Sequence, residues 1–163
     1  MAKKDISFLE NEYLHFLMMN FFIGENSMEI NGEIFYYQPK NRISFFSEVN
    51  SEKVDIESIN LVTNKEMYVA FKDTKIIKQI DILLNNKNSS ITFSIKSSPL
   101  RITGISMPKS IAEEFEDKVL ERLLYFECVK AFFRLTFKSF LDMRISTEWN
   151  TLLNNFDDYL KKY

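Results

Sequence analysis

Four basic side chains near the C-terminal end are the residues best suited to chemistry: Lys130, Arg134, Lys138 and Arg144. The first three recur at intervals of four, which in a helix brings side chains to one face. Cations in such a row could contact the phosphates of a nucleic acid, which would hold a protein on the backbone without any reading of bases. The alternative is a solvated face whose positive charge is favoured near a helix C-terminus.

A second candidate is His15, the single histidine. One histidine excludes a metal site built on several histidines and leaves any histidine-dependent triad on a residue inside an apolar segment. Glu12 lies three residues earlier, on the same face of a helix, where it could orient the imidazole as a base. Because no nucleophile motif accompanies the pair, we expect His15 to be a core residue.

Carboxylates crowd one turn at Glu113, Glu114, Glu116 and Asp117, as the metal site of a nuclease would require. They also stand where a helix is expected to begin, and the helix dipole stabilises negative charge there. We favour this second interpretation; the alternative is a nuclease built on Glu113, Glu116 and Asp117. Because the chain has only three glycines, no glycine-rich phosphate loop is expected. The sequence therefore predicts no enzyme, no metal site and no cofactor.

A helix is expected over residues 7–23. Ser7 and Glu10 have the spacing of a capping box, in which each side chain satisfies a free amide of the first turn. Gly24 is suited to end the helix in the left-handed conformation. The apolar run inside this helix is too short to cross a bilayer, and the acidic residues before it do not fit a signal peptide. We therefore expect a buried helix in a protein without a membrane partner.

Strands are predicted next. Asn31-Gly32 is a two-residue hairpin signal. Pro39-Lys40-Asn41 predicts a second turn, between strands at residues 33–38 and 42–49. A short helix behind an asparagine cap is favoured over residues 63–72, with a strand as the alternative.

The clearest hairpin joins strands at residues 75–84 and 89–97 through a turn at 85–88. Apolar and polar residues alternate along its second strand, which predicts one buried and one solvated face. A further strand is expected from Pro99 to about Met107.

The last third of the chain is predicted to be helical. Ser110 and Glu113 form a second capping-box pattern, and the long helix behind them should keep one apolar face on the core. That face consists of Phe115, Val119, Leu123, Phe126, Phe133, Phe137 and Phe140. A final helix, opened by Ser146 or Thr147, should lie flat on the core through apolar residues spaced by three and four. These residues are Trp149, Leu152, Leu153, Phe156, Tyr159 and Leu160.

Together the elements predict one α+β domain over residues 1–163. Its antiparallel sheet should have about five to six strands, flanked by an N-terminal helix and two C-terminal helices. A net charge of -2 argues against a strongly basic nucleic-acid-binding domain, although a local basic face can coexist with it. The single cysteine, Cys128, lies in an apolar stretch and is expected to be a small core residue of a cytoplasmic protein.

Several phrases of the sequence resemble, in order, those of the RdgC-like recombination-associated family. Residues 8–19 resemble its FLGREFLTWLWW phrase, and residues 66–75 its EA..AL..GK segment. Residues 120–122 resemble its LLER phrase, and residues 140–146 with Trp149 its FLxxRLSxxW phrase. The departures are Phe16, Met18 and Met19 for its usual tryptophans, Thr74 for its glycine, and the absence of the N-terminal half of longer members.

The resemblance implies a non-enzymatic accessory protein of DNA recombination that binds DNA without sequence specificity, often as a dimer. Under this hypothesis the DNA-binding residues are the cations named first: Lys130, Arg134, Lys138 and Arg144.

The rival hypothesis is a protein–protein adaptor without nucleic-acid binding. It would dock a partner through exposed aromatics among Phe35, Tyr36 and Tyr37, and the basic stripe would only solubilise the helix. The DNA hypothesis further expects the stripe to be exposed and to join other cations, such as Lys75, Lys78 and Lys96.

Overall fold

The computed structural model describes residues 7–73 and 75–162, and for Ser7 it describes the backbone alone. Helices and a six-stranded antiparallel sheet make it an α+β fold, as the sequence predicts. The helices are α1 (Ser7–Ile23), the single 3-10 turn η1 (Leu61–Thr63), α2 (Lys65–Lys72), α3 (Phe115–Ile145) and α4 (Trp149–Leu160). The strands are β1 (Ser27–Ile30), β2 (Glu33–Ser47), β3 (Glu52–Glu57), β4 (Ile76–Asn85), β5 (Ser90–Lys96) and β6 (Arg101–Ser106).

The sheet has the strand order β1-β2-β4-β5-β6, and β3 also pairs with β2. Along the edge of the long β2, β1 pairs with its first part and β3 with its last part. The β1–β2 hairpin turns at Asn31 and Gly32, whose φ angles of 52° and 80° are those that the asparagine-glycine signal predicts. The β4–β5 hairpin is also confirmed.

The predicted turn at Pro39-Lys40-Asn41 is wrong, because β2 runs through it as one strand of 15 residues. Pro39 pairs with Ile82 of β4, and the register shifts before the next pair at Ile43. Proline cannot donate a ladder hydrogen bond, and an irregularity in the ladder accommodates it without ending the strand. β3, which pairs with the second part of β2, is a strand that the sequence reading missed.

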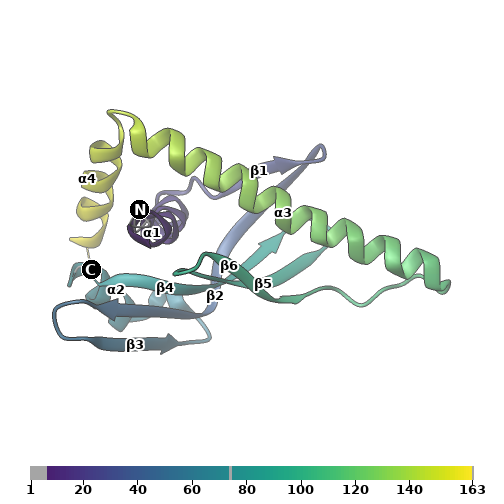
Figure 1. The fold of residues 1–163 in the computed structure, drawn as a ribbon, viewed down its shortest axis with the longest axis horizontal. Coiled ribbons are helices and arrows are strands. Elements are labelled where there is room, and N and C mark those ends of the chain that lie inside the picture. Colours follow the sequence, from purple (N-terminus) through teal and green to yellow (C-terminus); the bar gives the residue numbers. More distant parts are fainter. Residues whose placement is uncertain (1–6, 74, 163) are drawn as a thin grey trace, which may run out of the picture.

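The helix α1 crosses the inner face of the sheet, between the sheet and the helices α3 and α4 (Figure 1). It contacts β2, β4, α3 and α4, which explains why it can be apolar nearly all round. Gly24, at a φ of 85°, ends it as expected. The predicted capping box depends on the Ser7 side chain, which lies outside the described residues, while Glu10 accepts a hydrogen bond from the Ser98 amide at 2.8 Å.

α2 confirms the short helix favoured from the sequence. The Asn64 side chain caps it by accepting hydrogen bonds from the amides of Glu66 and Met67, at 2.9 and 3.3 Å. At the other end of the chain, α4 buries Trp149, Leu152, Phe156 and Leu160 against the core and contacts α1, α2 and α3.

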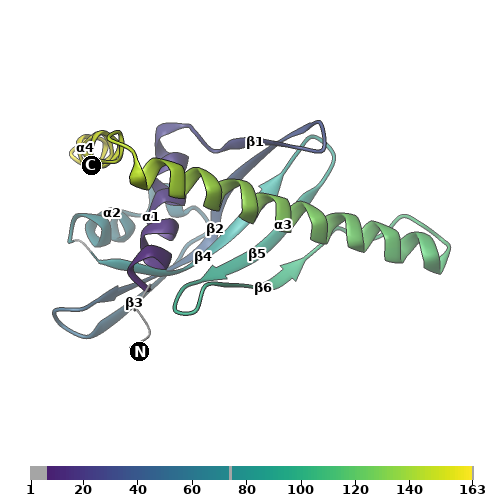
Figure 2. The ribbon, with the colours of Figure 1, turned by 45° about the horizontal axis from the view of Figure 1, so that its top comes forward.

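α3 has 31 residues and is therefore about 46 Å long at 1.5 Å per residue. Its second half covers the core, where Val129, Phe132 and Phe140 are buried. Inside that contact, Tyr13 of α1 and Thr136 of α3 share a hydrogen bond of 2.7 Å. The first half extends past the rest of the fold (Figures 1 and 2).

Candidate interaction surfaces

The basic stripe, Lys130, Arg134 and Lys138, lies on the outer face of α3. All three side chains are exposed, whereas Phe132 and Thr136 between them are buried. The helical spacing thus produces the stripe that the sequence predicts. Lys130 is paired within the helix, since its Nζ lies 3.3 Å from Glu127 Oε1.

Arg144 does not extend the stripe. Its Nε lies 2.6 Å from Glu12 Oε2 of α1, and its guanidinium carbon lies 5.5 Å from the centre of the Trp149 ring of α4. Only about a third of each charged side chain is exposed, at 36% for Arg144 and 32% for Glu12. The contacts therefore tie the end of α3 to α1 and α4.

The other cations considered from the sequence do not lengthen the stripe either. Lys75, Lys78 and Lys96 lie at or beside β4 and β5, and all three are half-buried. Lys78 donates to Asn11 Oδ1 of α1 at 3.3 Å and lies 5.9 Å from the Phe46 ring centre. They belong to the sheet, on the other side of α3 from its outer face (Figure 1).

His15 packs among aromatic rings. The centre of its imidazole ring lies 5.5 Å from the ring centres of both Phe71 and Phe156, in an edge-to-face arrangement. Burial lowers the pKa of His15 to about 4, so the ring is neutral at pH 7. The ring lines a cavity of about 320 Å³ between α1, β4 and α4. Glu12 binds Arg144 instead of orienting the imidazole, and the pair does not form a catalytic dyad.

The carboxylates at the start of α3 are dispersed and exposed. Glu113 and Glu114 precede the helix, and Glu116 and Asp117 lie in its first turn. The predicted capping box is wrong: the Ser110 hydroxyl accepts from the Ala112 amide inside the preceding loop, and α3 begins only at Phe115. Among residues 7–73 and 75–162, no group of three or more His, Cys, Asp and Glu side chains could hold a metal ion.

The aromatic cluster expected for a docking surface is divided by the alternation of β2. Phe35 and Tyr37 face the core and are each 3% exposed, whereas Tyr36 faces outward at 53%. The Tyr37 hydroxyl donates to the Leu17 carbonyl at 3.0 Å. The adaptor surface proposed from these aromatics is therefore wrong for Phe35 and Tyr37.

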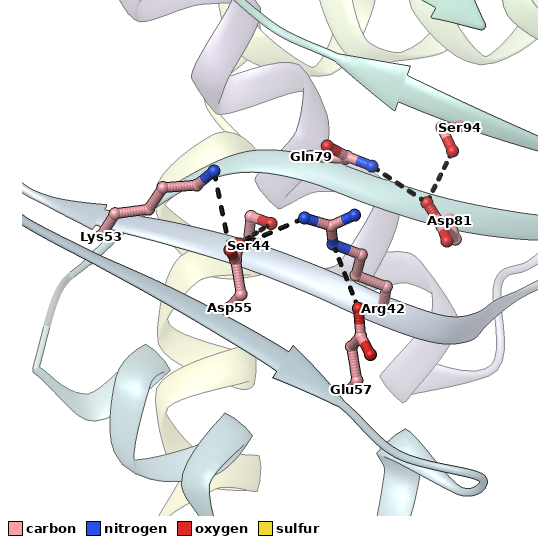
Figure 3. A network of polar contacts seen from close by, with 8 residues as sticks. All are labelled: Arg42, Ser44, Lys53, Asp55, Glu57, Gln79, Asp81 and Ser94. Carbon is pink, nitrogen blue, oxygen red and sulfur yellow. Dashed lines mark hydrogen bonds and ion pairs between the residues drawn. The ribbon is translucent and has the colours of Figure 1, made fainter. Parts of the chain in front are cut away.

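Polar contacts cross the strands of the sheet in Figure 3. Asp55 accepts from the Ser44 hydroxyl and lies 3.6 Å from both Arg42 Nη2 and Lys53 Nζ. The Ser44 hydrogen bond and the two cations hold the pKa of Asp55 below its ordinary value. On β4, Asp81 accepts from the Ser94 hydroxyl at 2.6 Å. The Arg42 ion pair and both hydrogen bonds connect side chains on neighbouring strands, so the network has a structural role in the sheet.

The first half of α3 carries a continuous apolar surface that the sequence did not predict. We call residues 115–126 the α3 arm; its large apolar side chains are between 40% and 78% exposed. They are Phe115, Val119, Leu120, Leu123, Leu124 and Phe126. One flank of the arm and the loop after β6 form a groove of about 810 Å³, lined by Phe115, Val119 and Phe126. Phe115, Val119, Leu123 and Phe126 were expected to face the core, but the sheet does not reach that far along α3.

An unbroken line of exposed residues runs along the whole outer face of α3. Its members recur at intervals of three and four, so they lie on one side of the helix. We call this line the α3 ridge: Glu116, Leu120, Leu123, Glu127, Lys130, Arg134, Lys138, Leu141 and Ile145. The predicted stripe is the middle of this ridge. Because the ridge contains both apolar and charged residues, its helical spacing does not appear as a periodic apolar pattern in the sequence.

In the part of the chain that the structure describes, no helix has the length and apolar composition that a bilayer crossing requires. Comparisons of the chain with family models, with curated proteins and with solved structures find no match.

Proposed function

We propose that this domain is a protein–protein interaction module whose binding surface is the α3 arm. The observation that carries the proposal is the exposure of six large apolar side chains on the α3 arm. A fully accessible aromatic side chain has a surface of about 150–250 Å². At their exposed fractions, the six side chains together present on the order of 500 Å² of apolar surface. This is near the upper end for the largest patch on a monomeric protein, and patches of that size mark interaction sites.

The proposal requires that the arm has no role in the core. Val49 and Ile59 are equally apolar and even more exposed, at 93% and 101%, but they stand singly in loops. The arm differs because its apolar residues are contiguous over three helical turns and border a groove. A contiguous, rigid helical face is the surface that helix-in-groove and helix–helix recognition use.

Site-specific photo-crosslinking in the producing cells tests this function. A benzoyl-phenylalanine at Phe126 or Leu123 should yield a covalent adduct with a protein, whose identity is read by mass spectrometry. The same probe at Val49 is the matched control and should yield none. Absence of an adduct from every arm position, with the protein folded, would overturn the proposed function.

A second candidate function rests on the basic stripe. We propose as the alternative that Lys130, Arg134 and Lys138 bind DNA phosphates without sequence specificity, as the resemblance to recombination-associated proteins implies. The supporting observation is that the three cations are exposed on one face, about 6 Å apart along the helix axis. Arg144 is left out, because it pairs with Glu12.

Fluorescence anisotropy with random-sequence duplex tests the alternative. Three phosphate contacts predict a slope of log affinity against log salt of about -2.7. A Lys130→Glu, Arg134→Glu, Lys138→Glu variant should lose binding, and Lys161→Glu on α4's exposed end serves as the control. No binding at low salt, or equal binding by the folded triple variant, would eliminate DNA as the ligand.

A further inference from the structure

We infer that the groove beside the α3 arm binds a short acidic segment of another protein, in which a carboxylate stands between two large apolar side chains. The inference rests on the proposed function, because it names the kind of partner that the arm takes. Its basis is the order of apolar and basic residues along the groove.

On the helix side, the groove is lined by one row of residues that recur at intervals of four, three and four, and so share a face of α3. The members of this row are Phe115, Val119, Arg122 and Phe126. The three apolar members are 78%, 40% and 45% exposed. Arg122 lies between Val119 and Phe126, about one turn from each. The row therefore presents a positive charge with apolar surface on both sides.

The opposite wall of the groove has the same character. It is formed by the end of β6 and the loop that follows, where Ile105, Met107 and Pro108 are half-buried and Lys109 is exposed. Both walls thus combine apolar surface with a cation.

The groove is basic although the whole chain is acidic. Three cations line it, Lys109, Lys118 and Arg122, against one carboxylate, Glu121. Glu121 also lines the cavity on the other flank of the arm. The three cations are exposed and form no ion pair with another residue that the structure describes. Their charge is therefore available to an anionic group of a partner.

The carboxylates of the first turn of α3 lie outside the groove. Neither Glu116 nor Asp117 lines it, and Glu116 belongs to the α3 ridge on the outer face. This distribution favours a protein segment over a lipid surface, because helices that lie on anionic membranes carry Lys and Arg across their polar face. A basic groove between two walls fits a narrow acidic chain.

The length of the groove suits a short segment. From Phe115 to Phe126 the helix rises about 17 Å at 1.5 Å per residue. About five residues of extended chain, at roughly 3.3 Å each, cover that distance. This is enough to place one carboxylate at Arg122 and an apolar side chain at Val119 and at Phe126.

Selection from a phage-displayed library of random-sequence peptides, with the whole protein as bait, tests the inference. The enriched peptides should carry Asp or Glu between large apolar residues and should be poor in Lys and Arg. Enriched peptides without this acidic bias, or no enrichment, would overturn the inference.

Charge reversal in the groove tests the contact quantitatively. Lys118→Glu with Arg122→Glu should raise the Kd of a selected peptide, measured by fluorescence anisotropy, at least about tenfold. The same peptide with Lys in place of its carboxylates should bind this double variant better than it binds the wild type. Lys138→Glu, a reversal of an exposed cation outside the groove, is the matched control and should leave the Kd unchanged. An unchanged Kd in the double variant, folded by circular dichroism, would contradict the inference.

Other occupants of the groove give different results. Cosedimentation of the wild type with phosphatidylserine vesicles, or a photo-adduct between two copies of this chain at Phe126, would assign the groove to a lipid or to self-association and overturn the inference. A photo-adduct with another protein, without selection of acidic peptides, would refute the acidic segment but leave the interaction function intact. Absence of both adducts and selected peptides would refute both.

Discussion

At the scale of single residues, charged side chains that look alike in the sequence have different roles. Lys138 extends into solvent from the outer face of α3, while Arg144, less than two turns later, bridges Glu12 and the Trp149 ring. The difference arises because Lys138 lies on the outer face of α3, whereas Arg144 lies where the end of α3 meets α1 and α4.

We predict that Arg144→Ala lowers the free energy of unfolding by about 1 kcal/mol, because it removes a partly exposed ion pair and a cation–π contact. Lys138→Ala is the control and should change stability by less than about 0.5 kcal/mol. Urea unfolding measures both. An Arg144→Ala protein of unchanged stability but reduced DNA affinity would show that Arg144 binds the ligand and is not a tie between helices.

The neutral state of His15 makes stability depend on pH. Burial lowers its pKa to about 4, so the unfolded chain, with an ordinary pKa near 6.5, binds the proton more readily than the folded chain. The stabilising contribution of the neutral ring is complete above about pH 6.5 and is lost as the pH falls toward 4.

We therefore expect the wild type to lose stability between pH 7 and pH 5, measured by the urea midpoint, and His15→Leu to lose less over the same range. The contribution of Asp55 does not interfere, because its pKa is already below its ordinary value and its loss occurs at lower pH. Identical pH dependence of both proteins would mean that His15 has the same pKa in the folded and the unfolded chain, which contradicts the lowered value.

At the scale of elements, α3 combines two structural roles in one continuous helix. Its second half covers the core, where Val129, Phe132 and Phe140 are buried. Its first half is the α3 arm, whose large apolar side chains are exposed. The change occurs where the helix passes beyond the elements that cover it, not at a break in its own sequence.

The helix α4 belongs to the core. It buries Trp149, Leu152, Phe156 and Leu160, and full burial of one such side chain contributes about 1.5–3 kcal/mol. We predict that a chain ending before Thr147 gives no cooperative thermal transition or is insoluble. Leu152→Ala, a milder change at the same contact, should remain folded with a lower midpoint. Cooperative melting of the truncated chain near the wild-type temperature would show that α4 is a detachable arm.

At the scale of the whole molecule, the charge of -2 conceals a separation of charge along α3. The acidic side chains gather at and before its N-terminus, and the basic stripe lies in its second half. Such a distribution favours a complementary protein surface over long-range attraction of a polyanion.

We also predict no nuclease activity. The carboxylates from Glu113 to Asp117 are exposed and flank a helix start, without forming a metal-holding group among the described residues. Labelled single- and double-stranded DNA incubated with the protein and magnesium or manganese should stay intact on a denaturing gel. Cleavage that disappears in Glu113→Gln or Asp117→Asn would contradict this prediction.

The sequence by itself determined those features that depend on a few neighbouring residues. Gly24, Asn31-Gly32 and Asn64 specify a helix end, a tight turn and a helix cap, because each acts through backbone geometry within about four positions. For the same reason the helical spacing of Lys130, Arg134 and Lys138 was sufficient to predict one exposed stripe.

Only the tertiary structure decided which apolar and charged residues are covered. Whether Pro39 turns the chain depends on the pairing of β2 with β4, and whether Arg144 is free depends on Glu12, 132 residues away. Phe126 and Phe133 have equivalent positions in the helical repeat, but the first is exposed and the second packs against Tyr13. The two residues differ because the core lies beneath Phe133 but does not extend as far as Phe126. How far the core extends along α3 depends on tertiary packing, so the local sequence pattern does not reveal it.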